Sequence, residues 1–386
     1  MLLEFHMLKN FPPVNLNRDD TGAPKTCTFG GATRGRISSQ CLKRSWRKSA
    51  IFCEEIGSEN LGIRTRKLPE LVAERLLKMG FKPELTEAAS KIIAAIGKKE
   101  AKENSKKPKE EEKSATATKQ IIFYAPQDID AVANAVKTLL DKCETVKDVQ
   151  KIKSKDLEAV IEDADIRPIT LDIALFGRMV TCDAFRNVEA AMQVAHAIST
   201  NRITVESDYF TAMDDLLSGE NMEEAGAGMI GDTDYNASCY YIYASIDTDT
   251  LKESLKFSED ADTIIKKAIP ALLKAIAFTN PSGKQNSFAG HILPSCFMVE
   301  CKERKIPVSL VNAFVKPVQG WGKDSDLIKD SIQKLAEEAD SIKNSFDLPA
   351  TARLWFTVDK YNIQPQCATE TFNSFSELVN AVSKLI

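Results

Sequence analysis

The alternation of short strand-like segments with longer helical ones restricts the fold of this chain most. In residues 2–8 (LLEFHML), Leu3, Phe5 and Met7 fall on one side and Glu4 and His6 on the other, the period of two that is typical of a β-strand. Further strands are predicted at 171–177, 240–246, 295–301 and 352–358. Helices are predicted at 39–57, 66–97 in two pieces, 127 to about 163, 188–199, 259–278, 324–345 and 374–386.

This order of elements favours an α+β fold over a doubly wound sheet. No G-x-G-x-x-G or G-x-x-x-x-G-K-[ST] motif occurs, so nucleotide-cofactor folds have little support, and no repeat of 20–50 residues indicates a solenoid. With 386 residues, of which 43% are hydrophobic, the chain can bury a large core.

The composition also restricts where such a protein works. No apolar run of about 18 residues could span a bilayer, and the first ten residues carry an acid and a histidine, unlike a signal peptide. The nine cysteines are odd in number and include no C-x-x-C pair, which favours reduced thiols over disulfides or a zinc site. We expect a cytoplasmic protein with no membrane contact, no metal and no cofactor.

The charge distribution is strongly asymmetric although the net charge is only −4. Residues 21–53 contain no Asp or Glu. Of the 51 basic residues, seven lie in this stretch, so that 44 remain elsewhere against all 55 acidic ones. The seven are Lys25, Arg34, Arg36, Lys43, Arg44, Arg47 and Lys48. A local cationic surface on an acidic protein predicts a polyanionic partner at one defined place.

The helix predicted from Ser39 carries most of these cations. Lys43 and Arg47 form one i, i+4 pair, Arg44 and Lys48 form a second, and both are separated from the apolar side with Leu42 and Trp46. Ser38 or Ser39 is a good N-cap, and Gln40 follows in the first turn of the helix. The backbone N–H groups of this turn have no partner within the helix and favour the binding of phosphate. A solvated charged face is the alternative, but such faces usually mix both signs.

Asn10 to Gly35 is predicted to be a long loop because of its prolines and glycines. Within it, Arg18 is followed by Asp19 and Asp20. Adjacent carboxylates can hold Mg²⁺ for RNA cleavage, but aspartates in such segments are more often turn residues.

Two further segments are irregular. Residues 98–119 are almost free of apolar side chains and are predicted to form a charged surface loop, and residues 202–236 a projecting hairpin. Met179, Tyr209 and Phe210 lie beside predicted turns, where they either contact nucleic-acid bases or pack the hairpin onto the body.

Five segments together resemble a known family: LNRDDTGAPKTCTFGG at 16–31, RISSQCLKRSWRKS at 36–49, LDIALFGRM at 171–179, AHAIST at 195–200 and DYFTAMDDL at 208–216. They resemble the CasC family, the backbone subunit of the type I-E CRISPR Cascade complex. The first two segments are the most specific, whereas the C-terminal third is similar mainly in the order of its elements.

The resemblance implies a palm like an RNA-recognition motif (ferredoxin-like), with a helical fingers insertion and a thumb hairpin. The implied division is 1–58, 166–200 and 239–386 for the palm, 59–165 for the fingers and 201–238 for the thumb. It also implies a non-catalytic protein whose copies stack along the CRISPR RNA as a helical filament and kink it at intervals, while the remaining bases pair with target DNA. Other Cascade subunits would be further partners.

The same resemblance assigns roles to residues. Arg18, Lys25, Ser38, Gln40, Lys43 and Arg47 would contact the RNA backbone, Met179 would wedge near the kink, and Tyr209 and Phe210 would belong to the thumb. The other cations of the acid-free stretch, Arg34, Arg36, Arg44 and Lys48, complete the predicted RNA-binding set. The family commonly has Trp-Phe where this chain has Tyr209-Phe210.

Two other functions stay open at this point. One is a metal-dependent ribonuclease of a type III-like CRISPR complex that uses Asp19 or Asp20. The other is a protein-interaction scaffold that binds no nucleic acid.

Overall fold

The computed structural model describes residues 1–96, 117–143, 145–161, 165–212, 229–258, 260–320, 322 and 325–386. The chain forms two compact units. Unit 1 comprises residues 1–52, 192–248 and 269–386, and unit 2 comprises residues 53–191 and 249–268. The predicted thumb segment lies within unit 1, and the predicted fingers segment, 59–165, lies within unit 2 together with residues 166–191.

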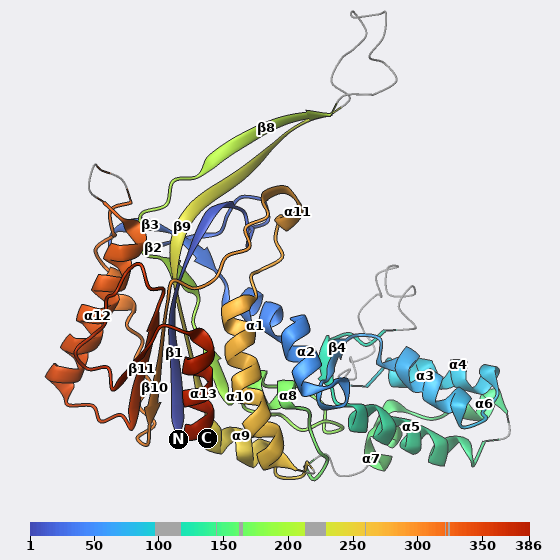
Figure 1. Cartoon of the computed structure of the whole chain (residues 1–386). Helices are drawn as coiled ribbons and strands as arrows, with labels where there is room; N and C mark the ends of the chain where they lie inside the picture. The colour runs from blue at the N-terminus through green and yellow to red at the C-terminus, as the bar shows by residue number, and fades with distance from the viewer. Residues whose placement is uncertain are drawn as a thin grey trace, which may run out of the picture. The chain divides into compact units, whose positions relative to one another are not determined.

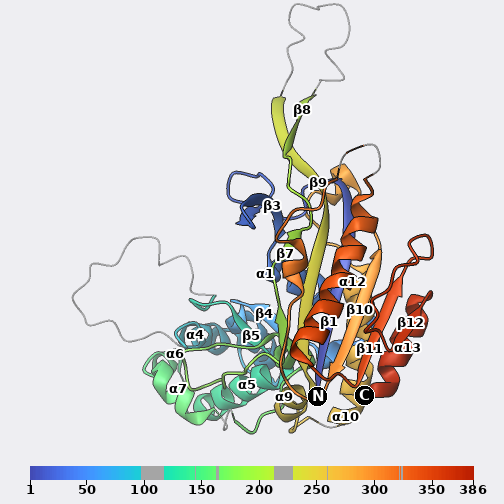
Figure 2. The same ribbon diagram turned by 90° about the vertical axis from the view of Figure 1, so that its left-hand side faces the viewer.

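Unit 1 is built on a ten-stranded sheet in the order β12-β11-β10-β1-β9-β7-β3-β2, with β6 and β8 also paired to β9 (Figures 1 and 2). Every pairing between these strands is antiparallel except that of β11 with β12. The strands are β1 (Leu2–Val14), β2 (Thr26–Phe29), β3 (Ala32–Ile37), β6 (Met192–Val194), β7 (Ala197–Ser199), β8 (Glu206–Ala212), β9 (Met229–Asp247), β10 (Cys296–Lys302), β11 (Ala352–Thr357) and β12 (Glu370–Phe372). A large, mostly antiparallel sheet with helices confirms the mixed α and β architecture.

The N-terminal strand is longer than predicted. β1 continues through Pro12 and Pro13, and its pairing with β9 shifts register between Phe11 and Val14. A proline lacks the N–H that a sheet needs, so the two prolines lie where the pairing is interrupted. The predicted loop from Asn10 to Gly35 was therefore wrong in part, because it also contains β2 and most of β3. Gly30 and Gly31, at φ 59° and 72°, make the tight turn between those two strands.

Both faces of the sheet are covered in unit 1. On one face, the ring of Phe375 in α13 (Phe375–Leu385) packs against Phe297 and Phe356 with ring centroids 5.6 and 5.8 Å away. On the other face, α12 (Leu327–Phe346) buries Ile332 and Leu335 in a cluster with Trp355. Figures 1 and 2 show α12 and α13 on opposite sides of the strands.

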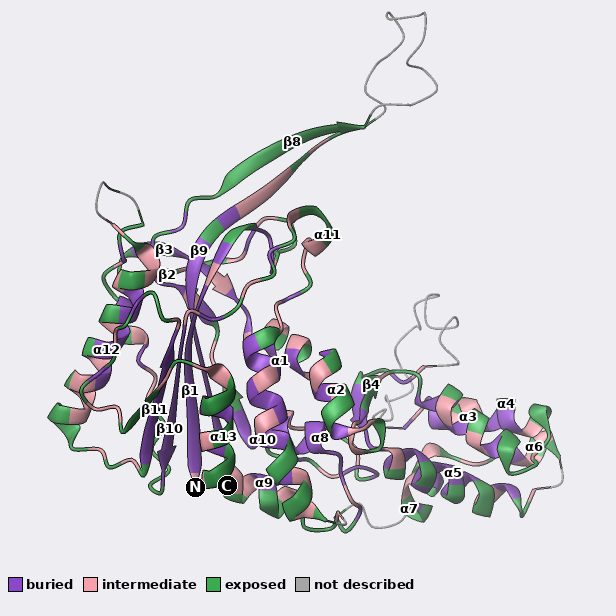
Figure 3. Ribbon diagram, in the orientation of Figure 1, coloured by how far each residue is buried: buried purple, intermediate pink, exposed green. Residues whose placement is uncertain are grey.

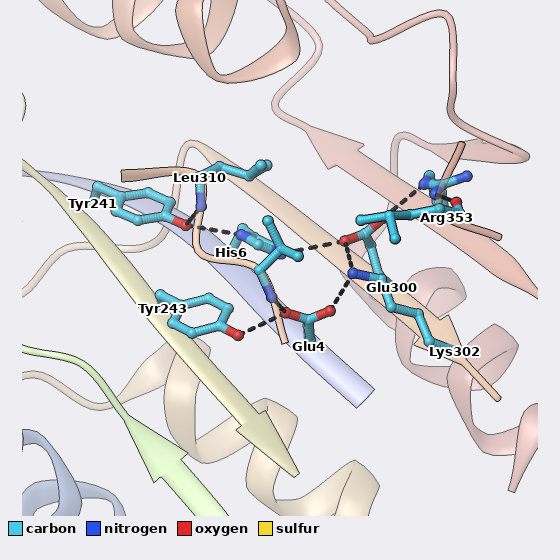
Figure 4. Close-up of polar contacts among 10 residues, drawn as sticks. Glu4, His6, Tyr241, Tyr243, Glu300, Lys302, Leu310 and Arg353 are labelled. Carbon is cyan, nitrogen blue, oxygen red and sulfur yellow. Dashed lines mark hydrogen bonds and ion pairs between the residues drawn. The ribbon is translucent and has the colours of Figure 1, made fainter. Parts of the chain in front are cut away.

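Two polar side chains of β1, those of Glu4 and His6, are buried on the α12 face. Glu4 accepts a hydrogen bond from the Tyr243 hydroxyl (2.6 Å) and forms an ion pair with Lys302 (Figure 4). Lys302 also lies 3.0 Å from Glu300, which in turn pairs with Arg353 at 2.6 Å. Two carboxylates and two cations are thus enclosed together, which satisfies charges that would otherwise be costly to bury.

His6 extends this buried network. Its Nδ1 lies 2.8 Å from the hydroxyl of Tyr241, and that hydroxyl also accepts a hydrogen bond of 2.9 Å from the backbone N–H of Leu310 (Figure 4). His6 is thus a buried strand residue with a structural hydrogen-bond partner.

Two predicted elements have the opposite secondary structure. The predicted strand 171–177 is the helix α8 (Leu171–Phe176), and the predicted helix 188–199 contains β6 and β7. All residues from Leu171 to Leu175 are buried, so the apparent alternation reflected a short segment enclosed on all sides, where periodicity does not distinguish helix from strand. Pairing with β9 holds β6 and β7 extended, and this overrides the helical propensity of the alanine-rich segment 190–197.

Unit 2 is mainly helical. Its core brings together Leu76, Ile93, Val132, Leu157 and Phe185, among other apolar side chains. Its elements are β4 (Ile63–Thr65), α3 (Leu68–Lys78), α4 (Pro83–Ile93), β5 (Ile122–Tyr124), α5 (Pro126–Leu140), α6 (Val146–Val149), α7 (Ser154–Val160), α8 and α9 (Thr248–Ser254), with a short 3₁₀ helix at Ser58–Asn60. The predicted helices at 66–97 and from 127 onward are confirmed. Of the predicted charged loop 98–119, residues 98–116 lie outside the described residues.

The remaining helices are α1 (Ser39–Arg47), α2 (Ala50–Ile56), α10 (Ala261–Phe278), α11 (Gln285–Phe288) and a 3₁₀ helix at Val311–Phe314. In the part of the chain that the structure describes, no helix is both long and apolar enough to cross a membrane.

Candidate nucleic-acid interface

The loop between β1 and β2 is a compact turn organised by Asp19. One carboxylate oxygen of Asp19 accepts hydrogen bonds from the N–H and the hydroxyl of Thr21 (2.9 and 2.7 Å) and from the N–H of Ala23 (3.1 Å). The hydroxyl of Thr21 is the main reason why the pKa of Asp19 is below its usual value. Arg18 forms a bridge with Pro24 across the base of the turn and is exposed. The turn therefore exposes Arg18 to solvent, whereas the carboxylate of Asp19 accepts hydrogen bonds within the turn.

A second group of positive side chains gathers where this loop meets β3. The backbone carbonyl of Lys25 accepts a hydrogen bond from the N–H of Arg36 (2.8 Å), and the guanidinium of Arg36 lies 3.3 Å from Nδ1 of His196. Burial, followed by the charges of Arg36 and Lys25, lowers the pKa of His196. Sequence reasoning missed His196 as part of this group, because only the pairing of β7 with β3 brings it there.

Helix α1 presents its cations in two rows. Leu42 and Trp46 are buried beneath it. Gln40, Arg44 and Lys48 are exposed on the outer side, and Lys43 and Arg47 are half-buried on the flank. Burial lowers the pKa of Lys43 below its usual value. Lys25 and Arg44 both lie near the thiol of Cys41, where their charges oppose the rise in pKa that burial causes. The helix and the loop thus belong to one cationic surface.

Ser38 is the N-cap of α1, as predicted. Its hydroxyl accepts a hydrogen bond of 3.3 Å from the N–H of Cys41, and its own N–H donates to the side chain of Asn17 at 2.9 Å. Ser38 is buried, and the main role of its side chain is to cap the N-terminus of α1. The single helix predicted for 39–57 is divided instead, because the hydroxyl of Ser49 accepts from the N–H of Phe52 and starts α2.

The loop and α1 border an open depression of about 560 Å³. It is lined by Leu16, Asn17, Arg18, Asp19, Asp20, Thr21, Gly22, Cys41, Arg44, Ser45, Ser282 and Gly283. The exposed guanidinium groups of Arg18 and Arg44 thus share one concave site with the carboxylates of Asp19 and Asp20. Paired guanidinium groups are suited to a phosphate-bearing ligand.

Arg34 does not belong to this surface. It is fully buried, and its guanidinium donates four hydrogen bonds of 2.6–3.1 Å to the carbonyl oxygens of Ser199, Thr200, Phe314 and Val315. The positive charge is used to join β3 to two other segments of unit 1. Arg34 is therefore not part of the candidate interface, which keeps the other six cations of the acid-free stretch.

The predicted projecting hairpin is confirmed as an antiparallel arm of β8 and the first part of β9. All seven residues of β8 are exposed, as the green ribbon in Figure 3 shows. Tyr209 and Phe210 lie on it with 64% and 41% of their surface accessible. The ring of Phe210 covers Gly231, where a Cβ atom would lie 2.6 Å from the ring. Residues 213–228 of the predicted hairpin lie outside the described residues.

Met179 belongs to unit 2 and is the most exposed large apolar residue described, at 89% accessibility. The chain around it is held firmly. Arg178 and Val188 exchange two backbone hydrogen bonds of 2.9 and 2.8 Å, and the N–H of Val180 donates to the side chain of Asn187 at 2.6 Å. A rigid turn therefore projects this apolar side chain into solvent.

Comparison with known proteins shows the family of the chain. The family model described as "CT1975-like protein" matches residues 3–381. The chain belongs to this family. A comparison of the CT1975-like chain with curated protein sequences found no match.

Two solved structures are similar to the CT1975-like chain over the full length of both partners. One is titled "CRISPR RNA-guided surveillance complex, pre-nicking" and has a TM-score of 0.81 at 27% sequence identity. The other, "CRISPR RNA-guided surveillance complex", has a TM-score of 0.71 at 23% identity and supports the fold alone. The predicted resemblance to proteins of CRISPR surveillance (Cascade) complexes is confirmed. The type I-E assignment stays a prediction.

Proposed function

We propose that this CT1975-like protein is a non-catalytic backbone subunit of a type I-E Cascade complex and holds the guide RNA by its phosphates. One observation carries the proposal. The acid-free stretch 21–53 folds into one cationic surface at the edge of an open depression, and His196, the residue before β7, joins it. The similarity to a chain of an RNA-guided surveillance complex supports the same function.

In this proposal, phosphate contacts position the strand and carry no sequence information. Specificity comes from pairing between the bound RNA and its target DNA. Copies of the chain follow one another along the RNA, together with other Cascade subunits. Exposed Met179, Tyr209 and Phe210 wedge against bases and kink the strand at intervals.

The proposed absence of catalysis concerns Asp19 and Asp20. Asp19 accepts three hydrogen bonds inside its own turn, which is the behaviour of a turn residue. Incubation of the assembled complex with complementary RNA and Mg²⁺ tests this. We expect the RNA to stay intact. Regularly spaced cleavage products that disappear in Asp19→Asn would support a ribonuclease instead.

The RNA-binding proposal is tested by the salt dependence of binding to single-stranded RNA of unrelated sequences. The double variant Lys43→Ala, Arg47→Ala should bind more weakly to every sequence. The slope of log K against log salt should also become flatter by about 0.7 for each phosphate that the variant no longer binds. The matched control is Arg64→Ala with Lys329→Ala, two exposed cations outside the acid-free stretch. An unchanged slope in the first variant would refute the assignment.

A further inference from the structure

We call residues 15–25, between β1 and β2, the cationic loop. A second segment borders the depression that this loop lines. We call residues 280–291, between α10 and β10, the strap. Lys9 anchors its start, because the buried ammonium group donates hydrogen bonds of 3.1 Å to the carbonyl oxygen of Thr279 and to the side chain of Asn280. Asn280 in turn donates to the carbonyl oxygen of Ile292 at 2.9 Å and closes the two ends of the strap on each other.

Two glycines, which have no side chain, allow the strap to pack closely against the segment that leads into the cationic loop. A Cβ atom on Gly283 would lie 2.3 Å from the carbonyl oxygen of Leu16, and one on Gly290 would lie 2.2 Å from Cγ1 of Val14. The ring of Phe288 also packs 5.6 Å from that of Tyr235 in β9. The strap is therefore fixed to β1 and to the base of the arm, and Ser282 and Gly283 form part of the wall of the depression.

The backbone of the strap is strained at two positions. Lys284 and Ala289, on either side of α11, have φ angles of 51° and 48°. The other non-glycine residues with positive φ in the described ranges are Asp or Asn, which tolerate this conformation. Strain of about 1–3 kcal/mol at a residue of another type persists where surrounding contacts enforce it, and such positions cluster at ligand-binding sites.

The side chains of the strap differ in character from those of α1. The strap has no acidic residue, one lysine, and the uncharged polar residues Asn280, Ser282, Gln285, Asn286 and Ser287. Ser282 and Asn286 are exposed. Cations such as those of α1 contact phosphates of RNA and DNA alike, whereas uncharged hydroxyl and amide groups can exchange hydrogen bonds with the ribose 2′-hydroxyl that DNA lacks.

We propose that the strap is the second wall of the nucleic-acid site, where Ser282 and Asn286 contact ribose 2′-hydroxyl groups and Lys284 contacts a phosphate. This inference rests on the proposed function and adds the basis of a preference for RNA over DNA. The cationic loop and α1 supply affinity for any single strand, and the strap selects the sugar.

The test compares binding of the full-length protein to single-stranded RNA and to DNA of the same sequence. Ser282→Ala with Asn286→Ala should weaken RNA binding by about tenfold, the effect of one or two hydrogen bonds, and leave DNA binding unchanged. Lys284→Ala should weaken both and flatten the salt slope by about 0.7. The matched control is Ser341→Ala with Asn344→Ala, two exposed residues of α12.

The outcomes separate the two proposals. If the wild-type protein binds neither strand, the proposed function fails. If it binds RNA but the double strap variant keeps the wild-type ratio of RNA to DNA affinity, only the strap proposal fails. Gly283→Ala provides an independent check, because its Cβ displaces the strap without removing a polar group, and it should lower the same ratio.

Discussion

The side-chain amide of Asn15 donates a hydrogen bond of 2.8 Å to the backbone carbonyl of Asp234. The same amide donates to the carbonyl of Gly22 at 2.9 Å. One fully buried residue therefore joins the cationic loop to the base of the arm. The proposed function assigns the cationic loop to phosphate contacts and the arm to base contacts. Both parts are held by the hydrogen bonds of Asn15.

Asn15→Ala should accordingly disturb both parts. It leaves two backbone carbonyls without a donor, which we expect to lower the free energy of unfolding by about 2 kcal/mol. Hydrogen exchange should become faster in residues 16–24 and 229–236, as measured by mass spectrometry. The exposed Asn344→Ala serves as the control. Equal exchange rates in wild type and Asn15→Ala would show that the amide does not hold the loop.

Lys9 should make the stability of the protein depend on pH. Burial lowers its pKa from 10.5 to about 7 in the folded state. Between pH 7 and pH 10 the unfolded chain keeps a proton that the folded chain releases. Stability should therefore rise by up to about 1.4 kcal/mol per pH unit across this range. Below pH 7 both states hold the proton and this dependence disappears.

Lys9→Met removes the titrating group while keeping a long side chain. Chemical unfolding at pH 7, 8 and 9 should show the rise in wild type and a smaller rise in the variant. Parallel curves for the two proteins would exclude Lys9 as the source.

Substitutions of Arg34 and Arg44 should have different effects, the first on the stability of the fold and the second on RNA binding. Arg34→Met removes four hydrogen bonds to backbone carbonyl oxygens and a buried charge, and it should lower the free energy of unfolding by about 3–5 kcal/mol. Arg44→Ala removes an exposed side chain and should leave stability within about 0.5 kcal/mol while weakening RNA binding. Thermal unfolding and RNA titration of both variants check the contrast. A loss of stability in Arg44→Ala would contradict it.

The exposed rings of the arm should contribute to RNA binding and little to folding. Tyr209→Ala and Phe210→Ala should each weaken RNA binding by about 1–3 kcal/mol if their rings stack on bases. Unfolding temperatures should stay close to wild type, because both side chains lie on the exposed strand β8, outside the core. Phe257, exposed to 39% on unit 2, offers a matched ring for the control Phe257→Ala. Unaltered RNA affinity in both arm variants would assign the rings to contacts with protein.

Sequence patterns with a strong local cause were predicted well. The alternation in β1, the apolar helix α10, the amphipathic helices α12 and α13, the N-cap at Ser38 and the projecting arm all follow from short-range physics. In each case, side-chain period or capping chemistry is independent of distant segments. The absence of acids between residues 21 and 53 likewise identified the candidate surface before any fold was known.

Long-range pairing decided the rest. Whether 188–199 became helix or strand depended on β9, a strand distant along the chain. Glu4 and His6 had the period of a solvent-facing side, but α12 and the segment before it cover them, and Lys302 and Arg353 complete their network. Arg34 resembles one more surface cation until β7 and residues 314–315 surround it. The sequence by itself determined which residues are charged, apolar or helix-capping. Only the tertiary structure decided which charges meet solvent, because the free energy of a charge depends on the partners and the water around it.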